Sequence, residues 1–472
     1  ILESGKNGLD AISCQNIQVK NSIIANSNNN GVNWNNNSSG VFTNNSILRT
    51  GLHAGRGVSG NGTYIALNIS THGIGTKSNV IQNNKIDSTG YIGIDFRSGN
   101  TTIKNNIISN FCMVKDDGAG IYTWHNTQGE NIIEGNTVSN KLSASEGTVN
   151  STALFVSGVY IDDQSKYVVI KNNKISFCAA SGIFLHNAKN INIIGNTVFS
   201  NGYSISNKEK GQLHIKLDTL GEMRGDMALH LDISQNKWIA NHDGSYCVFL
   251  SAKRKQDLRS LGTLNRNQYS AANPRLAVAE LYSQAGLCFA PEEFTLDSWH
   301  HDSLYESGSS FNTLPANKNF TITSKNLVSN GDMTSGSKGW IIWPEKSTIS
   351  LEKNKISNDD SSLKITIPAD QTEALLYHAG FALSNDKLYR LTFTAMSSKP
   401  TKLEFVPMMA GSPWRTLGTY TCFSIDSTSK TFTYFFKPNK NCTDARVNFK
   451  SNTTFWIGNV SLHEVVDNSF KK

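Results

Sequence analysis

The sequence predicts an all-β protein in which a right-handed parallel β-helix, over residues 1–325, precedes a β-sandwich (jelly-roll) domain over residues 326–472. Three observations lead to this prediction. Short strands that begin with Gly and a branched residue recur along the first half of the chain, an Asn turn follows each of them, and the composition changes near Lys325.

Five strands carry the repeat most clearly. They read GVNW from Gly31, GIDF from Gly93, GIYTW from Gly120, GVYID from Gly158 and GIFLH from Gly182. An Asn follows each of these glycines after 13 to 16 residues, at Asn45, Asn106, Asn136, Asn173 and Asn196. One coil therefore takes roughly 22 to 25 residues where no loop is inserted, which suits three short strands per turn with asparagines stacked at a corner. A β-propeller would need a period of about 40 to 50 residues, and a leucine-rich repeat would need Leu where this chain has Ile, Val and Asn.

Alternation along these strands predicts which side chains face the core and which face outward. The inward positions are Ile94, Phe96, Ile121, Thr123, Val159, Ile161, Ile183 and Leu185. The outward positions form two columns, Arg97, Trp124, Asp162 and His186 in one and Asp95, Tyr122, Tyr160 and Phe184 in the other. Because successive strands lie about 4.8 Å apart, neighbouring members of a column are expected to reach one ligand together.

The outward columns combine carboxylate, imidazole, guanidinium and aromatic groups, which suit a sugar ring and proton transfer beside it. The substrate-binding candidates are Asp95, Arg97, Tyr122, Trp124, His125, Tyr160 and His186. The competing interpretation is a decorated surface, on which an Asp at a corner only closes an Asx-turn. Large aromatic residues have no structural need to cluster on an exposed face, so the ligand-binding interpretation is favoured.

Two pairs of adjacent carboxylates lie on consecutive coils. Asp116 and Asp117 enter one strand, and Asp162 and Asp163 follow the next. Glycoside hydrolysis requires two carboxyl groups that flank the scissile bond, one protonated and one ionised. These four aspartates are therefore the catalytic candidates, and no metal site is predicted.

The composition bounds the class of partner and the compartment. Charged residues make up 17% of the chain and the formal net charge is +7, a polar surface without the concentrated Lys and Arg expected for nucleic acid. The expected partner is a polysaccharide or oligosaccharide, and the positive net charge allows this partner to be acidic. The protein itself is expected to be a monomer. Seven scattered cysteines without a C-x-x-C pair predict no zinc site, with one bridge, Cys422 to Cys442, left open.

Targeting is inferred from the ends of the chain and from its apolar runs. No stretch of eighteen apolar residues predicts a membrane span. The opening ILESGKNGLDAIS already reads as strand and turn, so we expect a signal peptide and some N-terminal coils to precede it. The protein is therefore expected to be secreted, or located at the cell surface or in the periplasm.

The segment DGAGIYTW, followed by GVYIDD and GIFLHNAKNINIIGNTVF, resembles the parallel β-helix glycoside hydrolases of bacteria, the β-xylosidase-like and fucosidase/xylanase-like families, with their pectate-lyase-like solenoid. The resemblance is most specific over residues 85–200. It implies that Asp117 and Asp162 are the catalytic pair, with Asp116 and Asp163 as close substitutes. Ala119 stands where Gly is commoner in the family, which leaves the choice between Asp116 and Asp117 open.

The later parts of the chain are expected to close the helix and add a module. The repeat fades from about Gln235, so irregular closing coils are expected, and FTLDSWHHDSLYESGS at 294–309 resembles a capping segment. Insertions between Asn45 and Asn83, and between Asn140 and Ser157, are expected to wall the outward face into a cleft.

The segment after Lys325 resembles β-sandwich carbohydrate-binding modules, which implies a stacking platform and allows a structural calcium ion; no other cofactor is expected. The platform candidates are Trp340, Trp343, Trp414 and Trp456, with Trp340 and Trp456 at positions that such folds bury.

Three classes of function stay open from the sequence. The favoured one is a secreted glycoside hydrolase. A polysaccharide lyase would abstract a proton beside a uronate carboxylate, with Arg97, Lys115, His53 and Arg56 as the candidate groups. A non-catalytic glycan-binding β-helix would leave the acidic pairs dispensable.

Overall fold

The computed structural model describes residues 1–36, 39–70, 78–140, 155–203, 210–218, 229–241, 245–254, 257–258, 261–282, 291–302, 306–314, 320–357, 360–418 and 420–467. The chain divides into two compact units. The β-helix unit comprises Ile1–Ser283 and Glu293–Ala316, and the sandwich unit comprises Gln284–Glu292 and Asn317–Lys472. The sandwich unit thus begins somewhat before the predicted boundary at residue 326.

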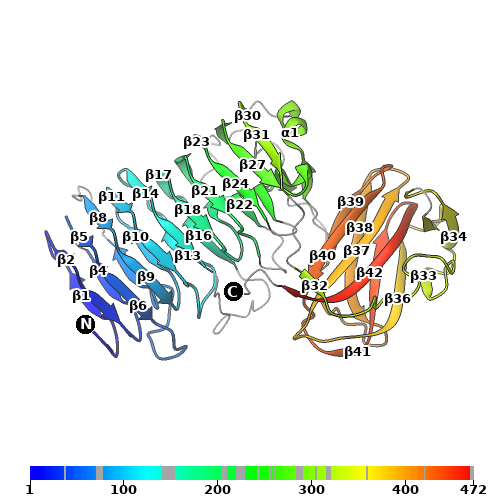
Figure 1. Ribbon diagram of the computed structural model, residues 1–472, viewed down its shortest axis with the longest axis horizontal. Helices are drawn as coiled ribbons and strands as arrows, with labels where there is room; N and C mark the ends of the chain where they lie inside the picture. The colour runs from blue at the N-terminus through cyan, green and yellow to red at the C-terminus, as the bar shows by residue number, and fades with distance from the viewer. Residues whose placement is uncertain are drawn as a thin grey trace. The chain divides into compact units, whose positions relative to one another are not determined.

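Three parallel sheets form the β-helix unit, and each coil gives one strand to each sheet (Figure 1). The first sheet contains, in order, β1 (Leu9–Ile12), β4 (Val32–Asn35), β7 (Leu67–Ser70), β10 (Ile94–Arg97), β13 (Gly118–Thr123), β16 (Val156–Ile161), β19 (Ile183–His186), β22 (Gly211–Leu217), β25 (Tyr246–Ala252), β28 (Val278–Tyr282) and β29 (Glu292–Phe294). The second sheet contains β2 (Gln18–Lys20), β5 (Val41–Thr43), β8 (Asn79–Gln82), β11 (Thr101–Lys104), β14 (Asn131–Glu134), β17 (Lys166–Lys171), β20 (Lys189–Ile194), β23 (Leu231–Ser234), β26 (Gly262–Asn265) and β30 (Glu306–Ser307). The third sheet contains β3 (Ile23–Ala25), β6 (Ser46–Thr50), β9 (Lys85–Thr89), β12 (Ile107–Ser109), β15 (Thr137–Ser139), β18 (Lys174–Ser176), β21 (Thr197–Phe199), β24 (Lys237–Ala240), β27 (Gln268–Ala271) and β31 (Ser310–Thr313).

The register of the first sheet confirms the predicted stacking of coils. Tyr122 pairs with Tyr160, and Tyr160 pairs with Phe184 on the following coil. All the side chains predicted to face inward are fully or almost fully buried. The glycines at the start of these strands allow this close stacking, since a Cβ on Gly93 would lie 2.5 Å from the carbonyl oxygen of Gly120.

A ladder of buried asparagines ties the coils together at one corner. Its members are Asn45, Asn84, Asn106, Asn136, Asn173, Asn196, Asn236 and Asn267. The side-chain amide of each of the first seven donates to the Oδ1 of the next Asn at 2.9 to 3.1 Å, and all eight also donate to a backbone carbonyl. The stacked asparagines predicted from the repeat are confirmed, and each coil gains specific bonds to its neighbour in place of buried unpaired polar groups.

The coils do not become irregular at Gln235, which corrects the sequence prediction. The Asn ladder continues through Asn236 and Asn267, and strands of all three sheets follow them. The coil geometry therefore persists after the glycine signature has faded. A short helix, α1 (Leu296–Asp302), follows β29 and buries Leu296 and Trp299 in the core of the β-helix unit. This packing agrees with the capping role expected for the segment at 294–309.

The sandwich unit consists of two antiparallel sheets around a core of its own. One contains, in order, β34 (Thr348–Lys353), β35 (Ser361–Thr366), β42 (Phe455–Asp467), β37 (Leu388–Ser397) and β40 (Lys430–Phe436), with β32 (Phe320–Ile322) paired to β42. The other contains β33 (Trp340–Trp343), β36 (Ala374–Leu383), β41 (Cys442–Ser451), β38 (Thr401–Met409) and β39 (Thr421–Ile425). As predicted, Trp340 and Trp456 are buried, whereas Trp343 and Trp414 expose 59% and 54% of their surface.

The cysteines differ from the expectation at one point. Cys422 is disulfide-bonded, but Cys442 carries a free thiol. The suggested bridge between these two residues is therefore wrong. In the described part of the chain, no helix is long and apolar enough to cross a membrane.

Candidate active site

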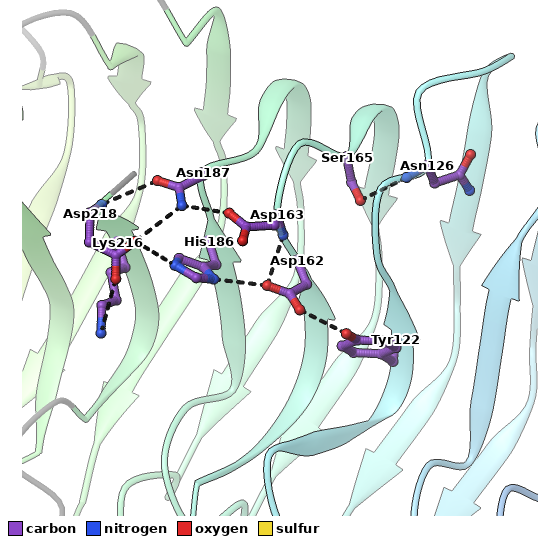
Figure 2. A network of polar contacts seen from close by, with 9 residues as sticks. All are labelled: Tyr122, Asn126, Asp162, Asp163, Ser165, His186, Asn187, Lys216 and Asp218. Carbon is purple, nitrogen blue, oxygen red and sulfur yellow. Dashed lines mark hydrogen bonds and ion pairs between the residues drawn. The ribbon is translucent and has the colours of Figure 1, made fainter. Parts of the chain in front are cut away.

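The polar network of interest lies where strands β16, β19 and β22 end, on three successive coils of the first sheet. Asp162 and Asp163 directly follow β16, His186 is the last residue of β19, and Asp218 directly follows β22. Figure 2 shows the hydrogen bonds running from Tyr122 on β13 through Asp162 and His186 to Asp218. Asp162 and His186 occupy equivalent positions on stacked coils, as the predicted outward column requires, whereas Tyr122 and Asp218 join the network from other register positions.

Asp162 is held by three donors. The hydroxyl of Tyr122 donates to Oδ2 at 2.7 Å, the backbone amide of Asp163 donates to Oδ1 at 2.8 Å, and Nδ1 of His186 lies 2.8 Å from Oδ1. Burial would raise the pKa of Asp162, but these hydrogen bonds and the positive charge of His186 outweigh it and hold the pKa below its usual value. Asp162 is therefore an ionised, oriented carboxylate at neutral pH.

His186 bridges two carboxylates. Its Nε2 lies 2.8 Å from Oδ1 of Asp218, opposite the contact of Nδ1 with Asp162. Burial would lower the pKa of His186, but the two carboxylates outweigh burial and raise the pKa to about 9. Asn187 joins the same network, because its side-chain amide donates to Asp163 at 2.6 Å and to Asp218 at 3.1 Å. His186 is thus an imidazolium that donates from both nitrogens.

Asp117 has the opposite electrostatic character. It directly precedes β13, while Asp162 directly follows the neighbouring strand β16, so the two enter the site from opposite strand ends. Asp117 remains accessible to solvent, yet the protein atoms crowded around its carboxyl raise the pKa, and the negative charges of Asp162 and Asp116 raise it further. The pKa values of Asp117 and Asp162 are therefore shifted in opposite directions.

Two aromatic side chains predicted to be exposed are buried, which corrects the sequence interpretation. Tyr160 and Phe184 expose only 4% and 1% of their surface, because they stack on each other and pack against Phe155. Phe155, directly before β16, therefore covers part of the outward face. The charges of Asp162 and Asp117 both raise the pKa of Tyr160, after burial itself.

A second group of candidates lies on the earlier coils. Asp95 is fully buried and forms an ion pair with Arg97, with Nη2 of Arg97 3.2 Å from Oδ2 of Asp95. The guanidinium of Arg97 lies over the ring of Trp124, 5.4 Å from its centroid. Trp124 exposes 44% of its surface, and the ring of the exposed His125 lies beside it. Asp95 accordingly orients Arg97, whereas Trp124 and His125 offer accessible surface to a ligand.

The remaining candidates have identifiable environments. The half-buried Asp116 adds negative charge beside Asp117. Lys115, considered as a lyase base, donates to the carbonyl of Gly60 at 2.8 Å and to Thr63 at 2.7 Å, so it fastens an early loop. Most of the insertion between Asn140 and Ser157, and part of the one between Asn45 and Asn83, lie outside the described residues.

Asp162, Asp163 and His186 offer ligand atoms within 4.8 Å of one another, a spacing that can hold a metal ion. An imidazolium has no free lone pair for a metal. The flanking carboxylates raise the pKa of His186 to about 9, so a metal ion at this position would have to displace the proton from the imidazolium.

Sequence reasoning missed Asp218, Asn187 and Lys216. Lys216 pairs with His186 in the register of the first sheet, and its Nζ lies 3.5 Å from Oδ2 of Asp218. The signal was the segment GQLHIKLD at 211–218, which alternates like the earlier strands and ends in a carboxylate. It was obscured because a longer insertion precedes it and Gln212 replaces the branched residue after Gly.

Comparison with known proteins supports the fold. The profile of the family described as "Right handed beta helix region" matches residues 1–138 and 58–220, and with the parallel pairing it identifies a right-handed β-helix. No curated protein matches the chain.

Solved structures match the chain only at low similarity. The enzymatically active domain of tailspike protein 4 from bacteriophage CBA120 is 12% identical, with 90% of this chain and 58% of that chain covered and a TM-score of 0.26. The CBM22-1 xylan-binding domain of Xyn10C from Paenibacillus barcinonensis is 9% identical, with 30% and 94% covered and a TM-score of 0.24. The N-terminal cellulose-binding domain of β-1,4-glucanase C from Cellulomonas fimi is 18% identical, with 30% and 98% covered and a TM-score of 0.24. Because these scores are low, function has to be argued from the site itself.

Proposed function

We propose that the β-helix unit is a glycoside hydrolase in which Asp117 is the general acid and Asp162 is the ionised carboxylate. The observation that carries the proposal is the environment of Asp162, where Tyr122, His186 and the Asp163 amide hold its carboxylate. Asp117 interacts with it electrostatically and has the raised pKa of a proton donor. Two carboxyl groups with opposite shifts are what hydrolysis of a glycosidic bond requires.

In the proposed reaction, Asp117 donates its proton to the glycosidic oxygen as the bond to the anomeric carbon breaks. The negative charge of Asp162 stabilises the positive charge that develops on the sugar ring. Water supplies a hydroxide to the anomeric carbon, and its remaining proton restores the acid. His186 and Tyr122 act as positioning residues, because their hydrogen bonds fix the carboxylate of Asp162 and keep it ionised.

A neutral sugar chain suits the site better than a uronate polymer. Asp117, Asp162, Asp163 and Asp218 place four carboxyl groups around it, and among the described residues the nearby cations Arg97, His186 and Lys216 already contact carboxylates. A uronate carboxylate would add a further negative charge to this cluster and meet repulsion.

The sandwich unit supplies a second function in this proposal, which is binding of the glycan polymer. Trp343 and Trp414 expose more than half of their surface, although a soluble sandwich gains nothing from an exposed indole. Aromatic faces of this kind stack on sugar rings. Binding of the polymer by this unit would raise the concentration of substrate near the β-helix unit.

The proposal is tested by incubating the full chain with a panel of neutral and uronate-containing polysaccharides. Release of reducing ends and the ultraviolet absorbance of unsaturated uronides are followed in parallel. We expect new reducing ends from a neutral polymer without a rise in absorbance. A rise in absorbance would indicate β-elimination and contradict the hydrolase assignment, and binding without any new reducing ends would indicate a non-catalytic protein.

A further inference from the structure

A cavity of about 610 Å³ opens on the second sheet, away from the network around Asp162. Its lining comes from four successive coils: Gly129, Glu130, Tyr167, Val168, Val169, Asn190, Asn192 and His230. None of these residues belongs to the site described above. The size is that of a site for a small ligand or an oligosaccharide segment.

Four lining residues occupy equivalent positions on the stacked coils. Asn131 pairs with Val168 and Val168 with Ile191, which places Glu130, Tyr167 and Asn190 side by side. The pairing of Asn192 with Asp232 adds His230 to the same column. Because successive strands lie about 4.8 Å apart, the column forms a line of polar and aromatic groups that runs along the axis of the β-helix.

Tyr167 has an unusual conformation for its residue type. Its φ is 59°, in the left-handed region, and the same region is occupied by Asn190 at 54° and His230 at 50°. This conformation is unfavourable for residues other than Gly and Asn, because it brings Cβ too close to the following carbonyl oxygen. Tyr167 nevertheless stands there with 48% of its surface exposed, so neither backbone preference nor core packing explains a large aromatic ring at this position.

The polar groups around the ring define a ligand class. Asn190, Asn192, Glu130 and His230 offer amide, carboxylate and imidazole groups that pair with sugar hydroxyls, and the face of Tyr167 suits the apolar face of a pyranose ring. Among the described lining residues there is no Lys or Arg to hold an anionic ligand.

We propose that this groove binds a segment of a neutral oligosaccharide, with Tyr167 as the stacking residue. Tyr167 follows Asp163 by only four residues, around the turn between the first and second sheets. The groove therefore lies within about 14 Å of contour length from the network around Asp162. A glycan held there can extend toward that network, but binding in the groove does not require the proposed hydrolysis.

The test uses the full chain carrying Asp162→Asn, so that substrate is not consumed, and isothermal titration with cellohexaose, xylohexaose and mannohexaose. The test variant is Tyr167→Asn, which removes the ring and keeps a residue that accepts the left-handed backbone, as Asn190 does on the next coil. We expect the affinity for at least one neutral hexaose to fall about tenfold or more, while the melting temperature stays equal or rises.

Two further variants sharpen the test. His230→Asn is also compatible with the left-handed backbone at this position, and it should weaken the binding of the same ligand. Gln235→Asn replaces another exposed residue with a φ of 60° that does not line the groove, and it should leave binding unchanged. Unchanged affinity in Tyr167→Asn, or no binding of any neutral hexaose, would overturn the proposal.

The experiments distinguish a wrong ligand class from a wrong proposed function. Binding that depends on Tyr167 but is confined to an oligogalacturonate of the same length would show that the neutral class is wrong. Binding of a neutral hexaose that depends on Tyr167, in a protein that releases no reducing ends, would support the groove and contradict only the hydrolase.

Discussion

At the scale of single residues, the environment of Asp162 decides what the network can do. Three donors, one of which is the imidazolium of His186, favour its charged form, whereas Asp117 is surrounded by negative charge and crowded by protein atoms. The pKa values of two chemically identical side chains are thereby shifted in opposite directions, which is the condition that the proposed acid and base roles need.

The first prediction concerns these two carboxyls. Asp162→Asn and Asp117→Asn should each lower kcat by several orders of magnitude, because an amide can neither donate the proton nor stabilise the positive charge. The double variant should be scarcely slower than either single variant, since the two groups act as a unit. Rates are measured on the polysaccharide that the panel identifies.

Asp87→Asn provides a control on the third sheet, because Asp87 bonds Ser109 and Asn110 on the next coil and not the site. It should keep full activity. Full activity of both Asp117→Asn and Asp162→Asn would leave the two carboxylates as turn residues and remove the catalytic assignment.

The second prediction concerns the pH dependence of stability through His186. Its pKa is raised from 6.5 to about 9, so its ion pairs stabilise the folded state fully below about pH 6.5, and this contribution is lost as pH rises through 9. The contribution is on the order of 3 kcal/mol at most, at about 1.4 kcal/mol per pKa unit. His186→Asn should therefore be less stable than the parent at pH 6, and the gap should close by pH 10.

Urea unfolding between pH 6 and pH 10 checks this prediction. His53→Asn, at an exposed position on an early loop, serves as the matched control and should show the parent's pH profile. A gap between His186→Asn and the parent that is independent of pH would mean that His186 contributes by packing and not by charge.

At the scale of elements, the coils are held in register by the Asn ladder as much as by apolar packing. Asn136 is almost fully buried, donates to the Ile103 carbonyl and to Asn173, and accepts from both the backbone and the side chain of Asn106. Each coil contacts only its two neighbouring coils, so one asparagine of the ladder stabilises the interfaces on both sides of its coil.

The third prediction follows from that coupling. Asn136→Ala should lower the free energy of unfolding by on the order of 3 kcal/mol, because several buried donors and acceptors lose their partner at once. Asn312→Ala, at an exposed position in β31, should change stability by less than about 0.5 kcal/mol. The comparison is made by urea denaturation, and equal midpoints for the two variants would show that the ladder is not a stabilising element.

At the scale of the whole molecule, two units with separate cores divide the proposed work. The β-helix unit carries the carboxyl network, and the sandwich unit carries the exposed Trp343 and Trp414. Binding and catalysis are then separable properties of one chain.

The fourth prediction tests this division. Replacing both Trp343 and Trp414 by Ala should weaken binding to the insoluble polymer about tenfold or more and leave the hydrolysis of short soluble oligosaccharides unchanged. Ile341→Ala, at an equally exposed position on the same strand as Trp343, is the control and should keep polymer binding. Equal loss on polymer and oligosaccharide would assign the two indoles a structural role.

The sequence by itself determined the period of the coils, the asparagine corner, the inward side of each strand, and the placing of Asp162 and His186 in one outward column. These features are local, because strand alternation and a repeated turn depend on residues close in the chain. The burial of Trp340 and Trp456 was instead implied by the resemblance of this segment to sandwich modules, which bury an aromatic residue at these positions.

Only the tertiary structure decided which outward residues are covered and which carboxylates interact. Phe155, directly before β16, packs against Tyr160 and Phe184, and Asp218 reaches His186 from a strand that an insertion separates in sequence. The closing coils kept their geometry without the glycine signature, because the backbone pairing of stacked strands tolerates many side chains. Burial and charge coupling depend on contacts between coils, which alternation along one strand does not encode.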